Sequence, residues 1–335
     1  MKLVGVGACY LDTILSVPYY PSEDEKLRAT TIAHRRGGNV PNALEVLQQL
    51  PKPDHKNDHS LILCSVLPSV SSVGVQEIKK SFGPNVDLSH CLHREQCPEP
   101  ASSYIIKSCS IDSRTIVNYN DLPEMTLAEF TTVVGNIGKE ASWYHFEGRN
   151  PDVTLQCMQY LRRAYSNVTI SVEIEKPGRI GLEEMAAEAD VVFYSKSWAF
   201  ERGYQDAASC LKAQADVAIR ATFLFCTWGE DGSAAFDIKE QELHLQHAFP
   251  AVSPGVVEYA HQLPISYLGM LISSSPIGAG DTFIAGILYG LLWHSDDWDM
   301  VRKLAFANEL ASRKVCRKGF GGLGSTMRTF GFNPP

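Results

Sequence analysis

The feature that most constrains the fold of this chain is a regular alternation of short apolar runs with segments of helical periodicity. The apolar runs each end in polar or glycine-rich residues, and they occupy 2–9, 61–67, 141–148, 168–174, 189–194 and 222–229. Between them, segments such as 153–166 repeat apolar residues at helical spacing. This alternation is typical of a parallel sheet with helices on its faces, where ligands gather at the carboxyl ends of the strands. The sequence therefore predicts a doubly wound, mostly parallel α/β fold.

Two segments depart from this alternation, at about 13–36 and 102–119. Both have β character without helical periodicity, and the second predicts a hairpin that turns at 111–113. We expect them to form a small antiparallel β lid outside the main sheet. No internal repeat is visible, so residues 1–335 are predicted to form a single domain that carries this lid.

Charge and cysteine usage exclude several classes of protein. The formal net charge is -8 and the basic residues form no run, which argues against a nucleic-acid partner. The nine cysteines include no CxxC pair, as expected for free thiols in a reducing compartment. The apolar runs are too short to span a membrane. We therefore expect a cytoplasmic protein without a membrane partner.

A glycine-rich turn introduces the most apolar helix that the sequence predicts. Apolar residues recur at four-residue spacing from 283 to 292, so the helix should be buried nearly all round. Its first turn is Gly278-Ala279-Gly280-Asp281, and the unpaired N–H groups of such a turn can hold a phosphate or an oxyanion. Asp281 is either a reactive carboxylate or an acidic residue that stabilises the helix dipole, and we expect its ionised form to be favoured there.

Other polar residues are candidates for binding a ligand that carries hydroxyl groups. Gly38, Asn39 and Asn42 open a second helix, where they either recognise hydroxyls or form a capped turn. Asp12 follows the first strand and Asp24 begins the β-like stretch 24–38, and each is either a hydrogen-bond acceptor for a polyol or a solvated loop residue.

Two further pairs have equally open interpretations. Gly229 and Gly232 lie between two apolar runs, in a hairpin turn or in a second loop that faces an anion. Glu173 and Glu175 share one face of a strand, as a polar face or as acceptors for the water shell of a metal. The ten histidines show no pair at metal-ligand spacing, so the sequence identifies no metal ligands.

Two motifs in this order resemble the signatures of the ribokinase-like (PfkB) carbohydrate kinases. GGNxxNxA matches Gly37 to Ala43, and GAGD before an apolar helix matches Gly278 to Asp281. The resemblance covers essentially the whole chain and implies a ribokinase-like fold with ATP and Mg²⁺ as cofactors. It also implies that Asp281 is the catalytic base and that Gly278, Ala279 and Gly280 form the anion hole.

Five further stretches are similar to the ketohexokinase branch of that family, whose members phosphorylate fructose at the 1-hydroxyl. They are 20–28, 113–124, 145–150, 171–177 and 190–196. This similarity implies a homodimer that pairs through the lid. It also implies a set of sugar-binding residues, namely Asp12, Asp24, Gly38, Asn39, Asn42, Arg114 and Glu147. The nucleotide-binding residues that it implies are Gly229, Gly232, Asn308 and Cys316.

Ser275 and Pro276 replace an Asp-Thr pair that helps many family members to bind a monovalent cation, which leaves a requirement for K⁺ open. Three functions therefore compete. The chain is an ATP-dependent kinase of a ketose such as fructose, a kinase of a nucleoside or another polyol, or a catalytically lapsed protein that binds sugar or nucleotide as a regulator. A dehydrogenase is disfavoured because the segment 5–12 lacks the third glycine of the dinucleotide fingerprint.

Overall fold

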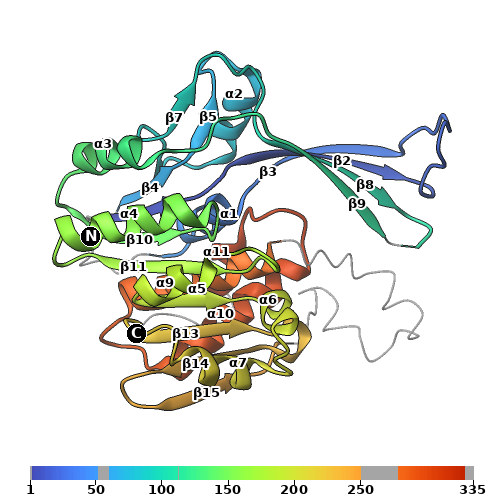
Figure 1. The fold of residues 1–335 in the computed structure, drawn as a ribbon. Coiled ribbons are helices and arrows are strands. Elements are labelled where there is room, and N and C mark those ends of the chain that lie inside the picture. Colours follow the sequence, from blue (N-terminus) through green and yellow to red (C-terminus); the bar gives the residue numbers. More distant parts are fainter. Residues whose placement is uncertain (1, 52–59, 112, 250–277, 329–335) are drawn as a thin grey trace, which may run out of the picture.

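A computed structural model describes residues 2–51, 60–111, 113–249 and 278–328, and its centre is a sheet of nine strands (Figure 1). In spatial order the strands are β15 (Glu242–Gln246), β14 (Ser233–Asp237), β13 (Phe223–Thr227), β12 (Val191–Tyr194), β11 (Thr169–Ile174), β10 (Ala141–Phe146), β1 (Lys2–Val6), β4 (Ser60–Cys64) and β6 (Val86–Asp87). All neighbours are parallel except at β14, which is antiparallel to β13 and β15. The mostly parallel sheet is as predicted.

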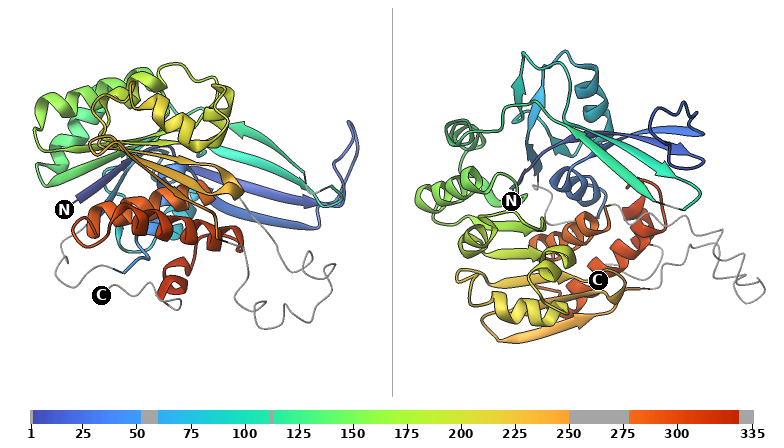
Figure 2. Two further views of the ribbon diagram at one scale, coloured as in Figure 1. Left: turned by 90° about the horizontal axis from the view of Figure 1, so that it is seen from below. Right: turned by 45° about the vertical axis from the view of Figure 1, so that its right-hand side comes forward.

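Helices cover both faces of this sheet, as Figure 2 shows from below. One face carries α1 (Asn39–Leu47), α9 (Ala279–Trp293) and α10 (Met300–Val315), followed by α11 (Leu323–Arg328). The other carries α3 (Leu127–Ile137), α4 (Pro151–Ala164), α5 (Leu182–Glu188) and α7 (Ala207–Gln214). The described ranges also contain α2 (Val73–Ser81) and α6 (Lys196–Glu201). No helix in the described ranges is long and apolar enough to cross a membrane.

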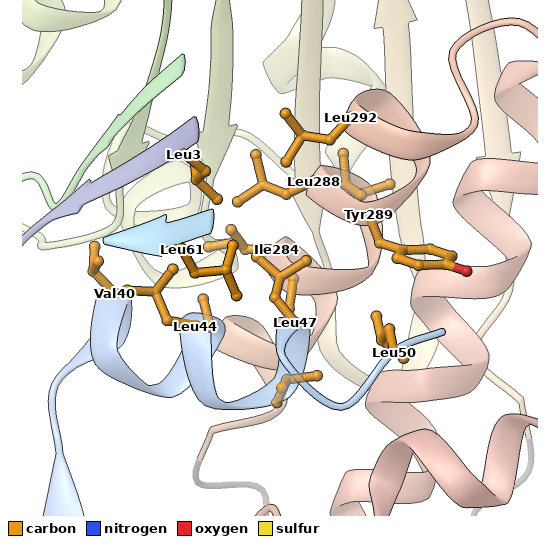
Figure 3. Close-up of a cluster of buried hydrophobic side chains, with 14 of the residues drawn as sticks. Leu3, Val40, Leu44, Leu47, Leu50, Leu61, Ile284, Leu288, Tyr289 and Leu292 are labelled. Carbon is orange, nitrogen blue, oxygen red and sulfur yellow. The ribbon is translucent and has the colours of Figure 1, made fainter. Parts of the chain in front are cut away.

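The apolar core is divided by the sheet because successive strand residues point to opposite faces. Leu3 of β1 belongs to the cluster under α1 and α9, whereas Val4 belongs to the cluster under α3 and α4. In Figure 3, Leu44 from α1 and Ile284 and Leu288 from α9 lie together. The two helices that carry the predicted signatures are therefore packed side by side.

The lid is a four-stranded sheet that projects from the body (Figure 1). It joins two antiparallel hairpins, one of β2 (Tyr10–Val17) with β3 (Thr31–Gly37) and one of β8 (Ser102–Ser108) with β9 (Arg114–Tyr119). The inner strands β2 and β8 pair in parallel, because both leave the body in the same direction. A separate two-stranded sheet pairs β5 (Val66–Pro68) with β7 (Leu92–Arg94).

Close packing of α9 on α10 depends on Gly286, since a Cβ there would lie 2.6 Å from Ala307 Cα. We predict that Gly286→Ala lowers the free energy of unfolding by about 1–3 kcal/mol through overpacking. Gly135 in α3 is the matched control, because nothing lies within 4 Å of a Cβ there. Gly135→Ala should stabilise the protein by roughly 0.5–1 kcal/mol through helix propensity. Urea unfolding of both variants measures the difference, and equal effects would contradict the packing argument.

Candidate active site

The first turn of α9 packs against Phe320 on its Gly278 side and is open on its Gly280 side. Gly278 is its N-cap with φ 84°, and the Thr282 hydroxyl donates to the Gly278 carbonyl at 2.7 Å. A Cβ on Gly278 would lie 2.5 Å from Phe320 Cζ, whereas nothing lies within 4 Å of a Cβ on Gly280. The N–H groups of this turn have no partner within the helix. The structure therefore leaves them accessible to an anion that approaches from the Gly280 side.

A chain of hydrogen bonds leads from the start of α1 to Asp281. Asn42 donates through Nδ2 to Asp281 Oδ2 at 2.7 Å, and Arg36 Nη1 donates to Asn42 Oδ1 at 2.8 Å. Arg36 is itself fixed, because it pairs with Glu45 and its Nε donates to Ser81 Oγ at 3.1 Å. Since Arg36 occupies the amide oxygen of Asn42, the amide nitrogen is directed at Asp281. Arg36 is an orienting residue that the sequence analysis missed, and its position directly before the Gly-Gly pair was the available signal.

A second buried network lies at the carboxyl ends of β10 and β11. Asn39 Nδ2 donates to Glu173 Oε2 at 2.8 Å, and His145 Nε2 lies 3.0 Å from Glu173 Oε1. The other ring nitrogen of His145 lies 2.8 Å from Ser171 Oγ, which also accepts from Trp143 Nε1 at 2.8 Å. Burial lowers the pKa of His145 to about 3, so the imidazole is neutral and orients the carboxyl group of Glu173.

Glu147 lies at the same edge of the sheet, and Asp12 lies in β2 near the base of the lid. Glu147 follows β10 and accepts from the backbone N–H of Ala8 at 2.7 Å. Asp12 is buried and accepts from Arg35 Nη2 at 3.2 Å. Gly38 adopts φ 107°, and a Cβ there would lie 2.1 Å from the Ala8 carbonyl oxygen, so no other residue fits. Strand β1 pairs with β4 on one side and with β10 on the other, so its carboxyl end opens at the switch point of the sheet.

Three carboxyl groups of this region have raised pKa values. Burial and then repulsion by Glu173 raise the pKa of Asp281 well above its usual range. Burial and repulsion by Glu175 raise the pKa of Glu173 to about 8, and burial raises that of Glu147 to about 7. The expectation that Asp281 favours its ionised form is therefore wrong. The helix dipole contributes only about 0.3–1 kcal/mol at an exposed site, which is less than the cost of burying a carboxylate beside another one.

The acidic residues fit a hydrated divalent cation. Glu173, Glu175, Ser195, Thr227 and Asp281 line one pocket beside the first turn of α9. Their oxygen donors suit Mg²⁺, which retains most of its water shell in proteins, and its charge would relieve the carboxylate repulsion. In the described ranges no three acidic, histidine or cysteine side chains form a closed metal cage. Such an ion would therefore be bound largely through water and through ligand oxygens.

The predicted nucleotide residues lie at a second place on the same edge. Gly232 ends the turn between β13 and β14, and its φ of 102° and contact with the Gln246 carbonyl require glycine. Asn308 of α10 donates to Ser233 Oγ at 2.6 Å, directly beside that turn. Gly229 opens the turn with φ 67°, and Cys316 caps the carboxyl end of α10.

Lys196 reaches the same turn, because its ammonium donates to the Trp228 carbonyl at 3.4 Å. The sequence analysis included this residue at the end of the stretch 190–196 but assigned it no role, and its place at the start of α6 was the signal.

Two predicted sugar residues lie away from this cluster. Asp24 is exposed with φ 62° in the connection between β2 and β3, and Arg114 is exposed at the start of β9. Both therefore belong to the projecting lid (Figure 1). The structure gathers Asp12, Gly38, Asn39, Asn42, Glu147 and Asp281 at the body, and it does not bring Asp24 or Arg114 to them within one chain. Ser275 and Pro276 lie outside the described residues.

The raised pKa of Glu147 predicts a pH-dependent stability. In the unfolded chain this carboxyl ionises near pH 4.3, so stability should fall as pH rises from about 4 towards about 7, by roughly 3 kcal/mol. Glu147→Gln retains an acceptor for Ala8 and removes this loss. Urea unfolding at pH 5 and pH 8 should show a smaller fall for Glu147→Gln than for the wild type. The exposed Glu230→Gln is the control, and an unchanged fall in Glu147→Gln would contradict the assignment.

Comparisons with known proteins agree with this geometry. The chain is 30% identical over 330 residues to mouse (Mus musculus) ketohexokinase, a match that covers 96% of this chain and 98% of that protein. No family model matches the chain.

Solved structures of low sequence identity share the fold. Thermotoga maritima ribokinase superposes with a TM-score of 0.72 at 13% identity and covers 98% of this chain and 99% of its own. Arabidopsis thaliana ribokinase has a TM-score of 0.70 at 17% identity, and the match covers 95% of this chain and 93% of that chain. A Methanocaldococcus jannaschii nucleoside kinase has a TM-score of 0.66 at 17% identity, with the same shares of the two chains covered. The chain belongs to the ribokinase-like (PfkB) family of carbohydrate kinases, which transfer a phosphate to a hydroxyl group.

Proposed function

We propose that this protein transfers the γ-phosphoryl group of ATP to a small ketose, with fructose 1-phosphate as the product. The observation that carries the proposal is the 2.7 Å hydrogen bond from Asn42 to Asp281, which joins a hydroxyl-recognising turn to a carboxyl group at a helix N-terminus. A sugar hydroxyl held by that turn lies beside both a proton acceptor and an anion-binding backbone. The likeness to ketohexokinase supports a ketose as the acceptor.

In this proposal the residues of the site divide the work of phosphoryl transfer. Asp12, Asn39 and Asn42 position the sugar, and the carboxylate of Asp281 accepts the hydroxyl proton as the sugar oxygen bonds to phosphorus and ADP leaves. The N–H groups of Gly278 to Gly280 stabilise the charge on the transferring group. Mg²⁺, when bound near Glu173 and Glu175, neutralises phosphate charge.

The raised pKa of Asp281 does not oppose this role. Asn42 donates a hydrogen bond to the carboxyl group, which favours the ionised form, and the charge of Arg36 acts in the same direction. Burial is the largest cause of the raised pKa, and a cation bound near Glu173 would relieve the second cause, the repulsion by Glu173. The base is then ionised mainly when the metal and nucleotide are present, so hydroxyl activation coincides with a complete site.

We also propose that the active unit is a cytoplasmic homodimer joined through the lid. The lid exposes apolar side chains, with Ile32 61%, Tyr104 50% and Val117 59% accessible. Covering them with a second lid removes apolar surface from water. Asp24 and Arg114 belong to this sheet, and contact with a partner places lid residues near a sugar that the isolated chain leaves distant.

A substrate panel tests the proposed reaction. We expect fructose to give the strongest sugar-dependent release of ADP from Mg-ATP, compared with ribose, glucose, adenosine and inosine, each with and without K⁺. A preference for adenosine or inosine would identify a nucleoside kinase instead. No ADP release with any of these acceptors, together with a melting temperature that ATP or sugar still raises, would support a regulatory binding protein.

Replacement of the base tests the assignment of Asp281. Asp281→Asn retains an acceptor for Asn42 and removes the carboxylate, so turnover should fall by roughly 10²–10⁴-fold while sugar binding stays within a few fold. Asp296→Asn, at an exposed aspartate beyond the end of α9, is the control and should retain turnover. The assay is initial-rate ADP release together with calorimetric sugar binding. Wild-type turnover in Asp281→Asn would refute the role.

A further inference from the structure

A buried lysine lies directly behind the first turn of α9. Lys314, in the last turn of α10, is 0% exposed, and its Cε lies 3.7 Å from the position of a Cβ on Gly278. Its ammonium lies 5.2 Å from the centre of the Phe320 ring and donates to the Arg317 carbonyl at 3.2 Å. In the described ranges it forms no ion pair with a carboxylate, so two of its three N–H donors have no protein acceptor.

This arrangement is costly for the folded protein alone. Burial of an ammonium with one neutral acceptor costs several kcal/mol, and the positive end of α9 adds repulsion. The carboxyl end of α10 offsets part of this, because a helix C-terminus favours a cation. Burial lowers the pKa of Lys314 to about 8, Arg35 and Arg317 also lower it, and Asp281 and Glu45 oppose the change.

Two neighbouring cations are also short of acceptors. Arg35 Nε and Arg317 Nη1 are buried without a partner among the described residues. Both guanidinium groups lie near enough to Lys314 to lower its pKa, so positive charge gathers behind the Gly278 turn. Convergence of buried positive charge on a helix N-terminus indicates an anionic ligand with several oxygens.

We propose that Lys314 is a positioning residue for phosphoryl transfer, a fixed internal cation that supports the Gly278 turn and strengthens its hold on the phosphate oxygens. It does not touch the substrate, because the Gly278 turn stands between them. The inference rests on the proposed function for its reaction, and it adds a residue that neither motif contains. The turn holds the phosphoryl group in line while it is transferred, so loss of the ammonium should lower turnover more than sugar affinity.

Lys303 offers a closely matched control on the same helix. It is also buried, its ammonium also donates to a backbone carbonyl, that of Trp298, and its stem also crosses a glycine of α9, Gly290. It lies at the opposite end of α10 from Gly278. Replacing the buried ammonium with an uncharged side chain should therefore change the free energy of unfolding by similar amounts in Lys303→Met and Lys314→Met.

The test compares steady-state kinetics of these variants with the sugar that the wild type uses best. Lys314→Met should lower kcat by about 30-fold or more with the sugar KM within about threefold, Lys314→Arg should recover part of kcat, and Lys303→Met should stay within about twofold. Wild-type kcat in Lys314→Met, or equal losses in both methionine variants, would overturn the proposal. If Lys314→Met fails to fold, the kcat of Lys314→Gln is compared with that of Lys314→Arg. A clearly lower kcat in Lys314→Gln supports the proposal, and equal kcat values overturn it.

Tripolyphosphate binding, measured by calorimetry, gives a readout that does not need turnover. We expect Lys314→Met to bind it about tenfold more weakly than the wild type or Lys303→Met does. If the wild type is inactive on the whole sugar panel and this difference in affinity persists, the proposed function fails but the role of Lys314 in phosphate binding is supported. Equal affinity in all three proteins would overturn that role of Lys314, whatever the substrate panel shows.

Discussion

The hydrogen bond between Asn42 and Asp281 is the contact on which the rest of the site depends. It joins residues 239 positions apart, and its 2.7 Å length is set by how α1 and α9 pack. Leu44 of α1 and Ile284 of α9 share one apolar cluster on one face of the sheet. The same buried surface that stabilises the domain thus fixes the separation between a hydroxyl-recognising amide and a carboxyl group.

Carboxyl groups gather on one side of that hydrogen bond, and cationic side chains gather on the other side. Glu173, Glu147 and Asp281 are carboxyl groups whose pKa values burial raises, so this side is short of cations. Lys314 and Arg317 lie on the other side with donors that lack acceptors in the described chain, so that side is short of anions. A magnesium complex of a polyphosphate satisfies both sides together, whereas a neutral sugar satisfies neither. This charge separation explains why the site contains perturbed groups of both signs.

Much of the fold could be predicted from the sequence, because strands buried on both faces are recognisably apolar and alternate with helical periods. Asp281 and Asn42 could be located because each belongs to a short local motif. The roles of Arg36 and Lys314 were harder to predict, because Arg36 packs against Phe82 and Lys314 against Gly278, which lie far from them along the chain. The ionisation of Asp281 was mispredicted for the same reason, since the repulsion comes from Glu173 on another strand. Local patterns indicate which residues meet the ligand, and long-range packing decides their charge.

Helix α10 carries two buried lysines that pass glycines of α9, and their positions along the helix give them different chemical surroundings. Gly290 of α9 lets α10 approach so closely that a Cβ there would lie 2.7 Å from the stem of Lys303, and the stem of Lys314 passes behind Gly278. At Gly290 the ammonium of Lys303 ends on the carbonyl of Trp298, far from any anion-binding turn. At Gly278 the same geometry leaves the ammonium of Lys314 behind a helix N-terminus with open N–H groups. Close helix packing thus supplies charge where phosphate oxygens would gather, and Gly278 serves the turn through its φ of 84° and its close contact with Phe320.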